Sequence, residues 1–247
     1  MNTKDIIQFC RDYLKTDQFE DFCYNGLQVE GVSEVKKIIT GVSLSQQLIK
    51  QAIKKEADMI MVHHGIFGNQ IGSNPKIEGF LKGRLKMLLE NDINLAGFHL
   101  PLDAHPEIGN NVSLCKKLGI TNLQSFDIGF IGDLEKDMKF QDLVDLVNNK
   151  LATDPYTIAA GPDQPRKVGV ISGGSSGDFK EAAQEGADTF IAGDLKEFVV
   201  RAVEETGINF INAGHYNTEK DGIYNLGELI KKEFGIEHEF IDIPCDV

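Results

Sequence analysis

Apolar residues recur along this chain at two different spacings. At positions 3–14 and 140–151 they return every three or four residues, as on the buried face of a helix. Mostly apolar runs at 59–62, 95–98 and 210–213 have the length and composition of buried strands. Strands that alternate with helices predict an α/β fold, with largely parallel sheets and flanking helices.

The order of these elements is nearly repeated within the chain. Residues 37–64 align without gaps on residues 167–194, and six of the 28 aligned pairs are identical. That many identities can arise by chance, but both segments run from a strand through a small-residue turn into a helix and then to a second strand. The likeness resumes where Asn94 matches Asn209. We interpret the repeat as a duplication.

The duplication predicts two related α/β domains, residues 1–125 and residues 126–247. The first carries His63, His64, His99 and Asp103, and the second carries a glycine-rich turn, His215 and Glu219. In an alternative division the domains are discontinuous, and the C-terminal part of the chain rejoins the first domain.

Three short motifs follow the predicted strands and carry four of the six histidines. Imidazoles and carboxylates at the carboxyl ends of strands are typical of sites for borderline divalent metals. Six such groups exceed what one tetrahedral ion needs, so the sequence predicts a dinuclear centre. The motifs are His63-His64-Gly65, His99-x-x-x-Asp103 and His215-x-x-x-Glu219.

The ligands can be assigned to two ions from their spacing. Neighbouring residues of a strand point to opposite sides, so His63 and His64 suit two adjacent ions better than one. The spacing of His215 and Glu219 places both on one face of a helix. We expect Glu219 to bridge the ions, with Asp103 and His64 on one ion and His63 and His215 on the other.

The remaining histidines and one acid have other expected roles. His99 is either a sixth metal ligand or a partner that orients Asp103. His105 and His238 lie away from the strand ends, which is typical of surface residues. Asp194 takes the place of His64 in the second copy, where it is a vestigial or outer acid.

Small residues at 171–177 lie between a predicted strand and a helix that starts near Asp178. Backbone amides of Gly173, Gly174 and Ser175 at such a place can bind a phosphate or carboxylate of a substrate. The alternative is a tight strand-to-helix turn, since the run has no Walker lysine and no full dinucleotide motif. The segment 25–29 can line the same cleft.

Composition narrows the classes of function. The chain of 247 residues carries 38 acidic and 25 basic residues, and its net charge of −13 disfavours a nucleic-acid partner. No apolar run approaches the roughly 20 residues that span a bilayer, so no membrane association is expected. The four cysteines are scattered without metal-ligand spacing, as expected for reduced thiols in a cytoplasmic protein.

Together these motifs resemble the family of GTP cyclohydrolase 1 type 2 homologues, also called NIF-three-like dinuclear metal proteins. They recur in the family's order over nearly the whole chain, and the turn at Gly173–Ser175 matches its small-residue loop. The resemblance implies two related α/β domains, a pair of divalent cations and a ring-shaped homohexamer. Its metal positions fall on His63, His64, Asp103, His215 and Glu219.

These observations predict a metal-dependent hydrolase of the cyclohydrolase or phosphoester type, acting on a nucleotide or another phosphorylated small molecule. Two cations lower the pKa of a shared water, and Glu219 or Asp103 can relay its proton. With GTP as substrate, attack falls on the carbon of the purine imidazole ring. The alternatives are a metal-binding or partner-binding ring without turnover and, less favoured, a ring that holds single-stranded nucleic acid. The ligands suit zinc, manganese, iron, nickel or cobalt.

Overall fold

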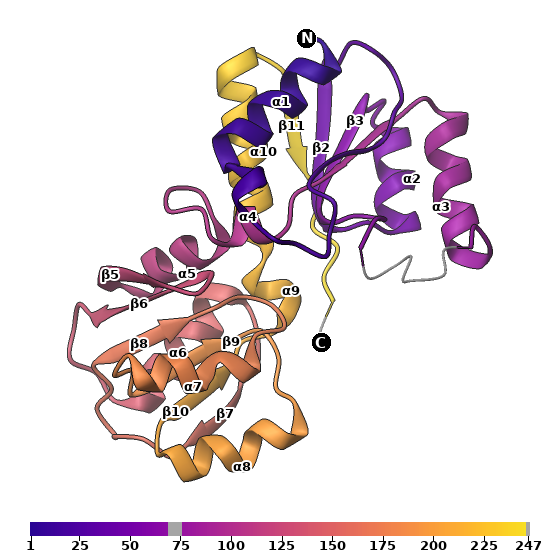
Figure 1. The fold of residues 1–247 in the computed structure, drawn as a ribbon. Coiled ribbons are helices and arrows are strands. Elements are labelled where there is room, and N and C mark those ends of the chain that lie inside the picture. Colours follow the sequence, from indigo (N-terminus) through magenta and orange to yellow (C-terminus); the bar gives the residue numbers. More distant parts are fainter. Residues whose placement is uncertain (69–75, 246–247) are drawn as a thin grey trace. The chain divides into compact units, whose positions relative to one another are not determined.

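The computed structural model describes residues 1–68 and 76–245, and these form two compact units (Figure 1). The first unit comprises Met1–Leu102 and Gly222–Ile243. The second comprises Asp103–Asp221 with Pro244 and Cys245. Both units have a sheet with helices packed on it, as the predicted α/β class requires.

The boundary between the units differs from the linear division at residue 125. The division is discontinuous, and the chain first leaves the first unit after Leu102. Strand pairing explains the difference, because β5 (Ile120–Phe126) is hydrogen-bonded to β6 (Gly129–Leu134). A boundary at 125 would separate these two strands.

In the first unit a sheet lies between two pairs of helices (Figure 1). Across the sheet the strands are β1 (Gly26–Val29), β4 (Asn94–Gly97), β3 (Met59–His64), β2 (Lys37–Ser43) and β11 (Glu237–Phe240). All neighbours are parallel except β1, which is antiparallel to β4. The helices are α1 (Thr3–Leu14) with α10 (Lys220–Phe234) on one face, and α2 (Gln46–Lys54) with α3 (Gly79–Glu90) on the other.

The second unit has a mixed sheet. Its strands follow the order β5, β6, β8 (Lys167–Val170), β9 (Thr189–Ala192), β10 (Asn209–Asn212) and β7 (Tyr156–Ala159). The β8–β9 and β9–β10 pairings are parallel, whereas the other three are antiparallel. The expectation of a largely parallel sheet therefore describes the first unit better than the second.

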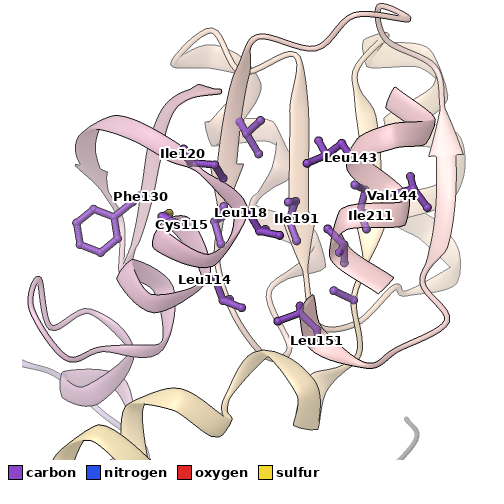
Figure 2. Close-up of a cluster of buried hydrophobic side chains, with 14 of the residues drawn as sticks. Leu114, Cys115, Leu118, Ile120, Phe130, Leu143, Val144, Leu151, Ile191 and Ile211 are labelled. Carbon is purple, nitrogen blue, oxygen red and sulfur yellow. The ribbon is translucent and has the colours of Figure 1, made fainter. Parts of the chain in front are cut away.

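Helices cover both faces of the second sheet. On one face α5 (Asn110–Leu118) and α6 (Phe140–Leu151) pack against the strands, and Figure 2 shows side chains of both helices around Ile191 and Ile211. On the other face a separate cluster includes Phe179 and Val199. These two come from α7 (Phe179–Gln184) and α8 (Glu197–Thr206).

The duplication is visible in the topology. The order β1-β4-β3-β2 of the first sheet corresponds to β7-β10-β9-β8 of the second. In both, the first strand of the series is antiparallel to its neighbour and the other three are mutually parallel. The copies differ at the far edge, where β11 is parallel to β2 but β6 is antiparallel to β8.

Two aligned polar residues make the same hydrogen bonds in each copy. Asp58 Oδ2 accepts from the amides of Lys36 and Lys37 at 2.7 and 3.0 Å. Asp188 Oδ2 accepts from the amides of Arg166 and Lys167 at 2.7 and 3.1 Å. These bonds hold the start of β2 or β8 against the turn before the next strand.

The asparagines at the start of β4 and β10 repeat the pattern. Asn94 accepts from the amide of Gly31 and donates to the carbonyl of Val32. Asn209 accepts from the amide of Gly161 and donates to the carbonyl of Pro162. The identities in the sequence repeat therefore include residues that anchor the strands.

One expectation about the first unit is wrong. His238 is predicted at the surface, but its side chain is only 1% exposed. Its ring lies between Thr40 and Glu228, with both nitrogens at hydrogen-bonding distance. Gly227 of α10 leaves room for the ring, since an added Cβ there would overlap it. β11 is short and mostly polar, so its sequence does not reveal which residues face inward.

Among the described residues, none of the helices combines the length and the apolar character needed to cross a bilayer.

Candidate metal centre

The predicted ligands divide equally between the units, with His63, His64 and His99 in the first and Asp103, His215 and Glu219 in the second. In the first unit the three imidazoles lie together at the carboxyl ends of β3 and β4. The ring centroids of His63 and His64 are 4.6 Å apart, and those of His63 and His99 are 5.0 Å apart. One nitrogen from each ring lies within 4.8 Å of the others, so these groups could hold a metal ion.

Each of the three rings is oriented by a different partner at Nδ1. His63 donates to the carbonyl of Phe98 at 2.9 Å, and His64 lies 2.9 Å from the hydroxyl of Ser43. His99 Nδ1 lies 2.9 Å from Asp21 Oδ1. Since Nδ1 takes the orienting bond in every case, Nε2 is the nitrogen that each ring offers to a cation. This donor set fits a borderline divalent metal.

Asp21 is an orienting residue that the sequence pattern does not indicate. Its buried carboxylate also accepts from the amides of Cys23 and Leu100 and from the side chain of Asn25. Burial would raise its pKa, but the hydrogen bonds from His99, Asn25 and the Cys23 amide outweigh this and lower the pKa to about 2. A permanent negative charge therefore faces the His99 ring.

The segment 25–29 braces the loops that carry the imidazoles. Asn25 Oδ1 accepts from the His99 amide at 2.7 Å, and Gln28 Oε1 accepts from the amides of Ile66 and Phe67. A Cβ on Gly65 would overlap the Gln28 side chain. Gly65 is therefore needed for the space beside its backbone, and Gln28 braces the loop that follows His64. That the segment also lines an anion cleft stays a prediction.

In the second unit His215 and Glu219 form a pair across one turn of helix. α9 (His215–Thr218) begins after Gly214, and Glu219 follows at its end. His215 Nε2 is 3.2 Å from Glu219 Oε2, as the i, i+4 spacing predicts. The Glu219 carboxylate is buried, whereas His215 is partly exposed.

Asp103 lies in a buried polar network of the same unit. Its Oδ1 accepts from Asn110 Nδ2 at 2.8 Å and from Ser172 Oγ at 3.0 Å. The amide of Ser172 donates to Asn111 Oδ1, which ties the network to α5. Asn110 and Ser172 are orienting residues that spacing alone does not identify.

Two amides of the glycine-rich turn, those of Gly173 and Ser175, donate within the second unit. Gly173 N donates to Thr218 Oγ1, and Ser175 N donates to the carbonyl of Gly173. Gly173 has a φ of +65°, and a Cβ at this position would overlap Glu219 Oε1. Two of the three amides are thus taken up by the tight turn, and an anion site at Gly173, Gly174 and Ser175 stays a prediction. The turn also makes room for the Glu219 carboxylate.

Two further expectations concern Asp194 and His105. Asp194 Oδ1 accepts from the amide of Ser176 at 2.7 Å, so it fastens the glycine-rich turn in the place where the first copy has His64. His105 is half-buried and accepts from the amides of Glu107 and Ile108. Its ring therefore stabilises a local turn.

Comparison with known proteins adds to this geometry. The chain matches the family described as Duf34/NIF3 (NGG1p interacting factor 3) over residues 1–246. It belongs to this family. The resemblance seen in the sequence is thereby confirmed, and family membership extends over both units.

Relatives and solved structures of the family are similar over nearly their full length. The chain is 44% identical to a "GTP cyclohydrolase 1 type 2 homolog" of Haemophilus influenzae, with 98% of each chain covered. A solved structure titled "protein ybgI, unknown function" is 38% identical and has a TM-score of 0.95 over 100% of both chains. TTHA1606 from Thermus thermophilus is 32% identical, with a TM-score of 0.93 over 100% of both chains.

Proposed function

We propose that the ligands of the two units together bind two divalent cations in one dinuclear centre. The observation that carries the proposal is the trio of imidazoles whose Nδ1 atoms are all fixed by hydrogen bonds. Such outer-shell bonds are a property of metal-ligating histidines. Glu219 bridges the ions in this proposal, and Asp103 completes the ligand set.

Covalent connectivity supports a shared centre. The chain passes from the first unit to the second between Leu102 and Asp103, three residues after His99. It returns between Asp221 and Gly222, shortly after Glu219. Asp103 and Glu219 therefore lie next to the two crossings, and Asp103 is the last residue of the short helix α4 (Leu100–Asp103), which begins directly after His99.

We propose that the centre is that of a hydrolase acting on a nucleotide or a related phosphorylated compound. Two bound divalent cations would activate water and polarise the substrate. The residues would hold the cations in fixed directions, since Asp21 orients His99 and Ser172 orients Asp103. Glu219 or Asp103, the acids of the ligand set, would relay the proton of that water. The name of the Haemophilus influenzae relative supports a GTP-like substrate.

Metal content and turnover test the proposal in separate steps. Protein purified without chelator should contain close to two divalent cations per chain, and Glu219→Gln should lower this number. His105→Gln is the matched control, because His105 belongs to a local turn. Hydrolysis of a nucleotide panel that includes GTP should stop on chelation and return with the added metal.

Two results would contradict the proposal. If Glu219→Gln keeps two cations per chain, Glu219 does not bridge them. Metal-loaded protein that converts none of the nucleotides would leave a metal-binding or partner-binding assembly as the function. The homohexamer and the cytoplasmic location stay predictions, and the mass of the purified protein in solution tests the former.

A further inference from the structure

Three large aromatic side chains are exposed on loops that adjoin the imidazoles of the first unit. Phe22 is 59% exposed, Tyr24 is 52% exposed and Phe67 is 40% exposed. Phe22 and Tyr24 belong to the loop that contains Asp21, and Phe67 follows the motif His63-His64-Gly65. Aromatic rings are usually buried because of their large apolar surface, so a group of exposed rings beside polar residues indicates a binding surface.

The two loops are fixed relative to each other. Tyr24 N donates to the carbonyl of Phe67 at 3.0 Å, and Gln28 Oε1 accepts from the Phe67 amide. Phe22 lies between Asp21 and Cys23 in the chain. The Asp21 carboxylate makes four hydrogen bonds, one of them with the His99 ring and another with the Cys23 amide. The aromatic rings are therefore presented by a braced backbone.

Phe22 connects the exposed rings to the imidazoles. Its ring centroid is 4.8 Å from that of His99, at an interplanar angle of 67°. This edge-to-face contact fixes one side of the Phe22 ring, while more than half of the residue is accessible to solvent. A flat ligand stacked on Phe22 would lie next to His99 and within reach of its neighbours.

We propose that Phe22, together with Phe67, is a stacking platform for a planar heteroaromatic ring, such as a nucleobase. Aromatic side chains bind bases through their faces with little dependence on sequence or substituents. The platform positions the ring so that its polar edge meets the imidazole cluster of His63, His64 and His99. This inference rests on the proposed function, because it names the residues that would hold the base of the substrate beside the same metal centre.

The absence of tryptophan from the chain allows a direct test. Phe22→Trp introduces a single tryptophan at the platform, on a side chain exposed enough to be replaced without disturbing the core. Titration with guanosine should quench its emission to saturation, and ribose 5-phosphate, which has no aromatic ring, should not. Phe198→Trp is the matched control, because Phe198 is 65% exposed on α8 of the second unit.

Removal of the ring completes the test. Phe22→Ala should weaken guanosine binding by roughly tenfold or more, measured calorimetrically, whereas Phe22→Tyr should retain it. Phe198→Ala should have no effect. Equal quenching of both tryptophan variants, or equal binding by wild type and Phe22→Ala, would overturn the platform. So would Phe22→Trp emission that responds to protein concentration but not to guanosine, since Phe22 would then be a contact between copies.

The test does not depend on turnover. Binding of guanosine without hydrolysis of any nucleotide would support the platform and contradict the hydrolase. Metal-dependent hydrolysis in which Phe22→Ala keeps the wild-type KM would support the hydrolase and contradict the platform.

Discussion

Asp103 receives two hydrogen bonds on one oxygen, and one of the donors can be removed with little change in volume. We expect Ser172→Ala to weaken divalent-cation binding by roughly tenfold to a hundredfold, because outer partners set the direction and basicity of a ligand. Calorimetric titration of the metal-free variant with Mn²⁺ or Zn²⁺ measures the change.

Ser175→Ala is the matched control for Ser172→Ala. Ser175 is buried in the same turn, but its hydroxyl donates to the carbonyl of Ile171 at 2.7 Å. Both variants should lose about 0.5–1.5 kcal/mol of stability with the hydrogen bond. An equal loss of cation affinity in both would mean that Ser172 supports the turn and not Asp103.

Gly173 is a position where the backbone and the available space both require glycine. It has a φ of +65°, and an added Cβ would overlap Glu219 Oε1. We expect Gly173→Ala to displace Glu219 and to lower the metal content measured by mass spectrometry. Gly177→Ala should leave the content unchanged, since no atom lies within 4 Å of its added Cβ. Wild-type content in Gly173→Ala would contradict Glu219 as a ligand.

For single residues, the sequence predicts the candidate metal ligands better than the residues that orient them. His215 and Glu219 could be paired from spacing because four residues of helix fix their separation. Asp21 could not be linked to His99, since 78 residues separate them and their contact depends on how β1 and β4 pair. The same holds for Ser172 and Asp103, which come together only when the second unit folds.

At the scale of elements, the matched aspartates are expected to stabilise the two sheets equally. Asp58→Ala and Asp188→Ala each leave two backbone amides without their acceptor. We expect each to lower the free energy of unfolding by about 1–3 kcal/mol, measured in urea by circular dichroism. Asp58→Asn and Asp188→Asn, which keep an oxygen acceptor, should cost less. If the substitution in one copy leaves the free energy of unfolding unchanged, the hydrogen bonds of that aspartate do not stabilise its sheet.

Acid should weaken the attachment of β11. Burial lowers the pKa of His238 from its ordinary value of 6.5, despite the opposing effect of Glu228 and Glu239, and Lys231 lowers it further. The hydrogen bond from His238 lowers the pKa of Glu228. The unfolded chain therefore binds more protons at both sites, so their stabilising contribution is present above about pH 6.5 and is lost as the pH falls.

His238→Gln isolates this contribution. Its free energy of unfolding should fall less than that of wild type between about pH 7 and pH 5, the range in which a histidine changes its charge. Parallel curves for wild type and His238→Gln would contradict the assignment.

Elements with strong local signals agree closely with their predictions. The helices Thr3–Leu14 and Phe140–Leu151 have the predicted bounds, because apolar spacing coincides with left-handed residues at Lys15 and Ala152 that end them. The strand Met59–His64 includes both histidines at its end, so they belong to the strand and do not follow it. Strands at the sheet edges, such as β5 and β11, are polar and gave little signal.

At the scale of the whole molecule, cysteines report on each unit separately. Cys10 is buried in the first unit and Cys115 in the second, and burial raises the pKa of both thiols, for Cys115 to about 12. Thiol reagents should modify the exposed Cys245 rapidly and these two only on unfolding. Mass spectrometry of digested protein follows each site.

Bound cations should protect both buried thiols if the centre is shared. At a cation concentration about 100 times the Kd, the population of the open state falls about 100-fold, and labelling of Cys10 and Cys115 should slow together. Protection of Cys10 alone would place the cations on the imidazoles of the first unit. That outcome would contradict a centre completed by the second unit.

The division into units could be predicted only in outline. A repeat in the sequence shows that there are two copies, but not which copy pairs with the segments between and after them. The helix α10 and the strand β11 follow the second copy in the chain, yet β11 pairs with β2 of the first. Long-range strand pairing of this kind leaves no local pattern in the sequence.

The retained anchors, Asp58 with Asp188 and Asn94 with Asn209, have a consequence for the history and redesign of this protein. The two copies share these anchors of the sheet but differ where the strands end, with His64 in one copy and Asp194 in the other. The residues that hold each sheet together are thus distinct from those at the strand ends. A substitution at a strand end, such as Asp194→His, can therefore be compared with the equivalent position of the other copy in the same chain.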